Sequence, residues 1–168
     1  MSQRHHLVLG GARSGKSGYA ERHALSLTDA PTYVATSRVW DDNHQQRIDE
    51  HRDRRDDRWH TIEEPLELAA TLEPLTGVVL VDCLSLWVTN LMFDERDVIA
   101  EAEALCARLP AFDAQIIFVS NEVGMGVHPE TSLGNRFRDL AGLVNQRFAS
   151  AVDQVDFIIA GLPLSLKK

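Results

Sequence analysis

Cysteine and long apolar runs are both scarce in this chain of 168 residues. The two cysteines, Cys83 and Cys106, lie inside apolar runs, so a disulfide scaffold is excluded and buried thiols in a reducing compartment are expected. No apolar run approaches the ~20 residues that a membrane-spanning helix needs. The polar residues 1–6 lead straight into an apolar run and lack the pattern of a signal peptide. These absences predict a cytoplasmic protein without a membrane span.

An excess of basic charge is also missing, because 17 Lys+Arg face 25 Asp+Glu and the net charge is -8. A non-specific nucleic-acid binder needs a basic surface, so that class is excluded. The length and the 44% hydrophobic content predict one globular domain over residues 1–168. Residues 1–58 carry 10 basic against 9 acidic side chains, whereas residues 59–168 carry 7 against 16. An anionic ligand is therefore expected in the first third of the chain.

Short apolar runs alternate with amphipathic stretches along the whole chain, which predicts an α/β fold with a mostly parallel sheet. Strands are predicted over residues 7–10, 32–35, 59–62, 78–82, 116–120 and 157–160. Helices are predicted over residues 16–27, 41–58, 66–72, 84–109 and 134–152. Residues 121–133, rich in loop-forming types, follow a predicted buried strand. Since ligands bind beyond the carboxyl ends of parallel strands, this loop is expected at the functional edge of the sheet, and a plain surface connection is the alternative.

A phosphate-binding loop is the strongest local motif, because residues 10–17 match G-x-x-x-x-G-K-[ST] without a mismatch. Its residues are Gly10, Gly11, Ala12, Arg13, Ser14, Gly15, Lys16 and Ser17. Backbone amides of such a loop surround phosphate oxygens, the lysine reaches the β- and γ-phosphates, and the final hydroxyl binds Mg²⁺. Lysine is otherwise found only at Lys167 and Lys168, so the one interior lysine stands where this motif requires it. The pattern predicts nucleotide binding, with Lys16 as a catalytic residue.

A carboxylate for Mg²⁺ is predicted at Asp82, which ends the apolar run 77–82. Together with Ser17 it would hold the ion directly or through water. The alternative interpretation is a carboxylate that only caps the end of a strand.

Residues 41–58 form a predicted helix whose charges are sorted onto opposite faces. His51 lies at the centre of the basic face, one turn from Arg47 and one turn from Arg55. Two flanking cations favour the neutral imidazole, which can act as a nucleophile toward a phosphate that the arginines hold. A plain surface histidine remains the alternative. A metal site fits less well, since the histidines lack a paired spacing.

Nine motifs, in order along nearly the whole chain, resemble the bifunctional adenosylcobinamide kinase/adenosylcobinamide-phosphate guanylyltransferase family of cobalamin biosynthesis. They are GGARSGKS (10–17), ATS (35–37), the paired aspartates (41–42), RI-x-x-HR (47–52), W-x-T-x-EEP (59–65), VDCLSLWVTNL (81–91), NEVGMG (121–126), FRDLAG (137–142) and NQR (145–147).

The resemblance implies two reactions. ATP or GTP phosphorylates adenosylcobinamide, and GTP then gives GMP to His51, from which adenosylcobinamide phosphate takes it to form adenosylcobinamide-GDP. It further implies a RecA-like P-loop fold and a homotrimer. The nucleotide contacts that it implies beyond the phosphate-binding loop are Ala35, Thr36, Ser37, Arg52, Asp53, Arg54, Arg55, Glu63 and Asp82.

Three features leave choices open at this point. Glu122 and Asp139 are candidates for activating the cobinamide hydroxyl group. Arg55-Asp56 stands where the family pattern has Arg-Pro, which predicts a longer helix here. A P-loop kinase for another small molecule and a nucleotide-gated subunit without enzymatic activity are the alternative functions.

Overall fold

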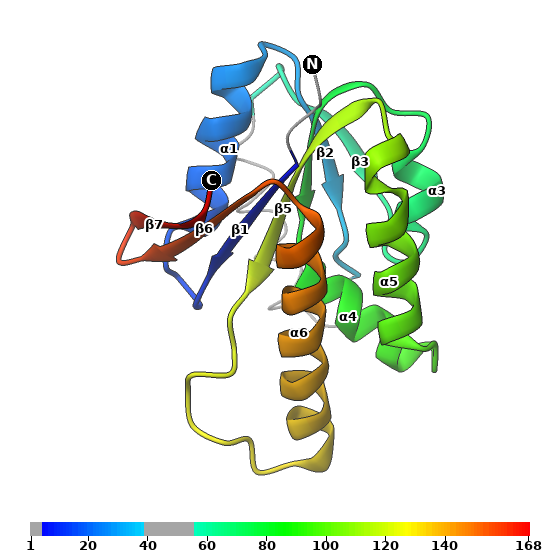
Figure 1. The fold of residues 1–168 in the computed structure, drawn as a ribbon, viewed down its shortest axis with the longest axis vertical. Coiled ribbons are helices and arrows are strands. Elements are labelled where there is room, and N and C mark those ends of the chain that lie inside the picture. The colour runs from blue at the N-terminus through cyan, green and yellow to red at the C-terminus, as the bar shows by residue number, and fades with distance from the viewer. Residues whose placement is uncertain (1–4, 39–55) are drawn as a thin grey trace.

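The computed structural model describes residues 5–38 and 56–168 and confirms the α/β class (Figure 1). Seven strands form one sheet in the order β3-β2-β4-β5-β1-β6-β7, and all neighbouring pairs are parallel except β6 with β7. The strands are β1 (His6–Gly10), β2 (Thr32–Ala35), β3 (His60–Glu63), β4 (Gly77–Asp82), β5 (Ala114–Asn121), β6 (Gln154–Ile159) and β7 (Leu162–Lys167).

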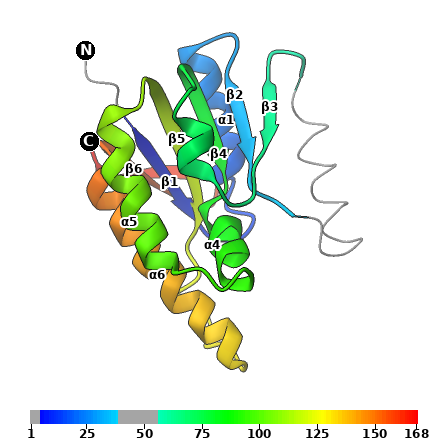
Figure 2. The same ribbon diagram turned by 90° about the vertical axis from the view of Figure 1, so that its right-hand side faces the viewer.

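Helices cover both faces of the sheet, and this explains why the central strands are so apolar. Helix α1 (Lys16–Leu27) lies on one face, and α4 (Leu84–Phe93), α5 (Val98–Arg108) and α6 (Ser132–Ala151) lie on the other (Figures 1 and 2). The short α3 (Leu68–Leu72) and the 3-10 turn Leu109–Ala111 complete the second layer. Strands β4 and β5 are buried from both sides, so alternation gives way to continuous Val, Ile and Leu.

All six predicted strands are present, with shifts of one to three residues at the ends of several of them. The segment 59–62 is observed as β3, 60–63, and the segment 157–160 as β6, 154–159. Helix α1 has the predicted bounds, whereas α3 and α6 differ from prediction by two residues at their first turns.

Strand β7 was not predicted, because most of its residues are exposed and it contains a proline. Pro163 is tolerated there because β7 is an edge strand, where a missing amide donor removes no interior hydrogen bond. Sequence periodicity detects burial, and an exposed edge strand gives little of that signal.

The predicted single helix 84–109 is wrong, since a break at residues 94–97 separates α4 from α5. Glu95 has a φ of 55°, a left-handed conformation that interrupts a helix. Asp97 then begins α5, because its carboxylate oxygen Oδ1 accepts hydrogen bonds from the amides of Ile99 (3.1 Å) and Ala100 (3.0 Å). The Asp-Glu-Arg-Asp run therefore contains a helix stop and a helix start.

The predicted helix 41–58 lies outside the described residues except at its end, where the prediction is wrong. Residues 56–58 form a turn in which the Asp56 carboxylate accepts a hydrogen bond from the Arg58 amide at 3.1 Å. The longer helix expected from Arg55-Asp56 is therefore not observed over its last three residues. In the part of the chain that the structure describes, no helix has the length and apolar content needed to cross a membrane.

We predict that Asp97→Ala lowers the free energy of unfolding by about 1 kcal/mol, because two amides at the start of α5 lose their acceptor. Urea denaturation at neutral pH measures the change. Asp113→Ala, at an exposed aspartate before β5, is the matched control and should change stability by less than about 0.5 kcal/mol. Equal effects of the two substitutions would mean that the cap does not stabilise α5.

Candidate functional site

The phosphate-binding loop connects the end of β1 to the first turn of α1, at the carboxyl edge of the parallel sheet (Figure 1). Arg13 and Gly15 have φ values of 55° and 93°, so the backbone turns twice through left-handed conformations. The Lys16 ammonium donates a hydrogen bond to the Gly11 carbonyl at 3.1 Å and so folds back over the loop. The helix N-terminus and the lysine thus face the same concave backbone, which suits an anion.

Close packing explains two of the glycines in the motif. A Cβ atom on Gly10 would lie 2.9 Å from the Ile158 carbonyl oxygen of β6, which is closer than real Cβ contacts. A Cβ on Gly15 would combine a strained φ with a 3.3 Å approach to Gly161 in the β6–β7 turn. The amide of Gly161 donates to the Ser14 carbonyl at 2.8 Å, so this turn braces the loop from outside.

Burial lowers the pKa of Lys16, and the nearby Asp82 and Cys83 oppose this shift. Burial also raises the pKa of the Cys83 thiol to about 11, so the thiol stays neutral at physiological pH. Of these two neighbours, Asp82 is therefore the one that carries a negative charge beside the lysine. A bound phosphate would complete the charge balance of this half-buried ammonium.

Asp82 ends β4, where the Tyr33 hydroxyl donates a hydrogen bond to its Oδ2 at 3.0 Å. The peptide bond that follows, to Cys83, is cis. The hydroxyl of Ser17 has no hydrogen-bond partner among the described residues and remains available to a ligand. A hydroxyl, a carboxylate and phosphate oxygens are the oxygen ligands that Mg²⁺ takes in such loops. In the same part of the chain, no group of three or more His, Cys, Asp and Glu side chains could hold a metal ion by itself.

The segment Ala35–Ser37 runs beside Asp82, because Ala35 is its register partner in the parallel β2–β4 pair. Thr36 is fully buried, and its hydroxyl both donates to the Cys83 carbonyl and accepts from the Cys83 amide, each at 2.8 Å. The Thr36 side chain therefore fastens β2 to the residue after Asp82. The Thr36 hydroxyl is thus already occupied. Among the predicted contacts Ala35, Thr36 and Ser37, the backbone of the segment and the half-buried Ser37 side chain are better placed to meet a ligand.

The structure brings the phosphate-binding loop, residues 35–37, Glu63 and Asp82 to one edge, because all follow or end parallel strands. Glu63 is exposed at the end of β3 and pairs in register with Ala35. The other predicted residues lie outside the described part of the chain; they are His51, Arg52, Asp53, Arg54 and Arg55.

Glu122 and Asp139, the two acids considered for activating the cobinamide hydroxyl group, lie in different surroundings. Both carboxylate oxygens of Glu122 accept hydrogen bonds from amides of its own loop, those of Gly124 (2.8 Å) and Met125 (3.2 Å). Asp139 is exposed on α6. Glu122 therefore shapes the loop after β5, and Asp139 has no contact with the phosphate-binding loop among the described hydrogen bonds and ion pairs.

A polar network at the same edge received no role in the sequence analysis. Its members are Ser85 at the start of α4, Ser120 and Asn121 at the end of β5, and Asn145 on α6. Asn121 belongs to the NEVGMG motif, but its partners are 24 and 36 positions away. The one signal available from the sequence was a pair of polar residues directly after the apolar run 116–119.

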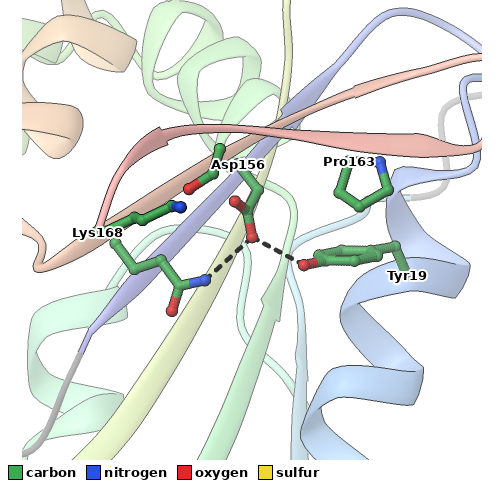
Figure 3. Close-up of a pocket in the computed structure, with 6 residues that line it drawn as sticks. Tyr19, Asp156, Pro163 and Lys168 are labelled. Atoms are coloured by element: carbon green, nitrogen blue, oxygen red, sulfur yellow. Dashed lines mark hydrogen bonds between the residues drawn. The ribbon is translucent and has the colours of Figure 1, made fainter.

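A separate cavity of about 430 Å³ lies between α1 and the β6–β7 hairpin (Figure 3). Tyr19 and Asp156 point toward one another there, and the tyrosine hydroxyl donates to Oδ2 of Asp156 at 2.8 Å. Nε2 of the buried His6 lies 3.0 Å from the same oxygen. Burial is the main cause that lowers the pKa of His6 to about 4, with His23 adding to it and Asp156 opposing it. This cluster ties α1 to the sheet behind the phosphate-binding loop.

Comparison with known proteins gives a family match over residues 6–166, to the family described as cobinamide kinase / cobinamide phosphate guanyltransferase. A bifunctional adenosylcobalamin biosynthesis protein CobP from Pseudomonas aeruginosa is 48% identical over 96% of both chains. The bifunctional adenosylcobalamin biosynthesis proteins CobU from Salmonella typhimurium and Escherichia coli are 40% and 38% identical, over 96% of this chain and 98% of theirs.

We predict that Lys16→Met weakens binding of a Mg²⁺–nucleoside triphosphate by at least about tenfold, because the phosphates lose a charge-assisted donor. Titration calorimetry on the full chain measures the affinity. Lys168→Met is the matched control, since Lys168 is exposed beside the separate cavity. A control that loses as much affinity as Lys16→Met would place the phosphates elsewhere.

The free energy of unfolding should fall as the pH is lowered from about 6.5 to about 4. In this range His6 takes up a proton in the unfolded chain but stays neutral in the folded protein. The full change corresponds to about 3 kcal/mol for this buried group, at 1.36 kcal/mol per pKa unit. Urea denaturation across this range should give a flatter profile for His6→Gln. His128→Gln, at an exposed histidine, should keep the slope of the unsubstituted chain. Parallel profiles for all three proteins would contradict the assignment.

Proposed function

Because the chain belongs to the cobinamide kinase / cobinamide phosphate guanyltransferase family, we propose that it catalyses both reactions of that name. The substrates are adenosylcobinamide and then adenosylcobinamide phosphate, with ATP or GTP as phosphoryl donor and GTP as guanylyl donor. The observation that carries this proposal is the phosphate-binding loop, with Lys16 beside Asp82, in a chain that aligns with bifunctional relatives over nearly its whole length.

In the first reaction the hydroxyl oxygen of adenosylcobinamide attacks the γ-phosphorus of the triphosphate. The bond to the β–γ bridging oxygen breaks, a nucleoside diphosphate leaves, and the hydroxyl proton passes to a base or to water. Lys16 and the backbone amides of the loop stabilise the charge on the phosphates. Ser17 and Asp82 would hold Mg²⁺, which neutralises phosphate charge when bound.

In the second reaction a nitrogen atom of His51 attacks the α-phosphorus of GTP, and pyrophosphate leaves. The resulting guanylyl-histidine is then attacked by a phosphate oxygen of adenosylcobinamide phosphate, which forms adenosylcobinamide-GDP and frees His51. The RI-x-x-HR motif and the spacing of Arg47 and Arg55, each four positions from His51, support this role. Arg52, Asp53, Arg54, Arg55, Ala35, Thr36, Ser37 and Glu63 complete the proposed nucleotide site.

A homotrimer, which rests on resemblance to the family, and a cytoplasmic location, which is expected from the sequence composition, are part of the proposal. Two other functions remain as alternatives, a P-loop kinase for a different small molecule and a nucleotide-gated subunit. Full-length similarity to relatives described as bifunctional favours the cobinamide enzyme over both.

We predict that incubation with α-³²P-labelled GTP and Mg²⁺ leaves an acid-labile, alkali-stable label on the protein, as expected for a phosphorus–nitrogen bond to histidine. His51→Ala should abolish the label. His44→Ala, at another histidine of the segment 41–58, is the matched control and should retain it. Addition of adenosylcobinamide phosphate should transfer the label to a small-molecule product.

Phosphorylation of adenosylcobinamide should persist in His51→Ala, because that reaction does not pass through the guanylyl-histidine. A label that His51→Ala retains would contradict the role of His51. Loss of both reactions in a folded His51→Ala protein would contradict the assignment of His51 to guanylyl transfer alone. A protein that turns over ATP but not adenosylcobinamide would favour the kinase for a different substrate.

A further inference from the structure

Strand β5 lies between the strand that leads into the phosphate-binding loop and the strand that ends in Asp82 (Figures 1 and 2). Its last residue, Asn121, is the register partner of Gly10, the first residue of the loop. The next amide, of Glu122, donates to the Gly10 carbonyl at 3.0 Å. On the other side of β5, Asp82 pairs in register with Val119. Asn121 therefore ends at the same edge as the phosphate-binding loop and Asp82, on the strand that lies between theirs.

The Ser85 hydroxyl holds Asn121 through both its backbone amide and its side chain. The Ser85 hydroxyl oxygen accepts from the Asn121 amide at 3.0 Å and from Nδ2 of Asn121 at 2.9 Å, and it donates to the Cys83 sulfur at 3.4 Å. Ser85 is 3% exposed, so this anchor is buried. The side chain is therefore linked through Ser85 to Cys83, the residue that follows Asp82.

The backbone of Asn121 is held as well, from the opposite layer. Nδ2 of Asn145 on α6 donates to the Asn121 carbonyl at 3.1 Å, and the Ser120 hydroxyl donates to Oδ1 of Asn145 at 2.7 Å. A strand end whose backbone and side chain are both fixed is preorganised. Binding a ligand there therefore costs little further loss of conformational freedom.

One N–H of the Asn121 carboxamide and its oxygen Oδ1 have no partner among the described residues. The side chain is half-buried at the end of β5, so a ligand at this edge of the sheet can reach it. The nearest acid along the chain, Glu122, turns its carboxylate to its own loop and does not compete for the donor. A fixed, uncharged N–H donor at the edge that also carries the phosphate-binding loop suits a phosphate oxygen.

We propose that Asn121 is a catalytic residue of the phosphoryl-transfer step, which donates a hydrogen bond from Nδ2 to an oxygen of the γ-phosphate. It thereby discriminates a nucleoside triphosphate from a diphosphate. This role rests on the proposed kinase reaction, in which the γ-phosphate is the group transferred. Since the diphosphate product lacks that group, the contact ends when the reaction is complete.

The test is the affinity of the full-length Asn121→Ser variant for two ligands in Mg²⁺, the β,γ-imido analogue of ATP and ADP. Affinity for the triphosphate analogue should fall by about tenfold or more, the usual cost of losing a hydrogen bond to a charged group. Affinity for ADP should stay within about twofold. In the kinase assay, kcat should fall while the KM for adenosylcobinamide is retained.

Asn135→Ser is the matched control, because Asn135 holds the far end of the same loop through the carbonyls of Pro129 (2.9 Å) and Thr131 (3.0 Å). It should leave both affinities unchanged. A second variant, Asn121→Asp, keeps the shape of the side chain but replaces its donor with a negative charge. It should lose more triphosphate affinity than Asn121→Ser, whether or not the serine variant folds.

Three results would overturn the proposal. They are equal loss of ADP and triphosphate affinity in both Asn121 variants, unchanged triphosphate affinity in both, or a loss in Asn135→Ser that matches the loss in Asn121→Ser. The last result would mean that Asn121 only anchors the loop. These affinities do not depend on adenosylcobinamide, so failure of the proposed kinase substrate would leave the binding result intact and distinguishable.

Discussion

Parallel hydrogen bonding of β1 to β5, and of β5 to β4, is the constraint on which the site depends. Because parallel strands end at the same edge, the phosphate-binding loop, Asn121 and Asp82 arrive there from three distant segments of the chain. Helices on both faces make that register stable, since a slip by one residue would turn buried side chains toward the opposite layer. The chemistry of the edge therefore follows from the packing of the core.

Two opposing effects act on the pKa of Lys16 in the phosphate-binding loop. Burial disfavours the charged form of Lys16 and lowers its pKa, whereas the nearby Asp82 and Cys83 oppose this shift. The Gly11 carbonyl and the helix N-terminus hold the ammonium and the loop amides in place, and the Gly161 amide braces the loop from the β6–β7 turn. In the proposed enzyme the two reactions differ in the phosphorus atom attacked, the γ-phosphorus in the phosphoryl transfer and the α-phosphorus of GTP in the guanylyl transfer.

Sequence patterns predicted the fold class, all six strands that they named, and α1 with its bounds, because burial on two faces and loop chemistry are local signals. They failed at the break between α4 and α5 and at β7. The break at residues 94–97 lies in a charged run that suits a surface helix equally well, until Glu95 adopts a left-handed conformation and Asp97 caps α5. Strand β7 is recognisable only by its pairing with β6, since its own side chains are mostly exposed.

The sequence by itself determined the phosphate-binding loop, the carboxylate at the end of β4 and the histidine proposed as nucleophile, because each is encoded within a few consecutive residues. Only the tertiary structure decided that Thr36 fastens β2 to Cys83. It also decided that Ser85 and Asn145 fix Asn121 beside Gly10. These contacts join residues tens of positions apart, and strand order and register, which set such distances, arise from packing of the whole sheet.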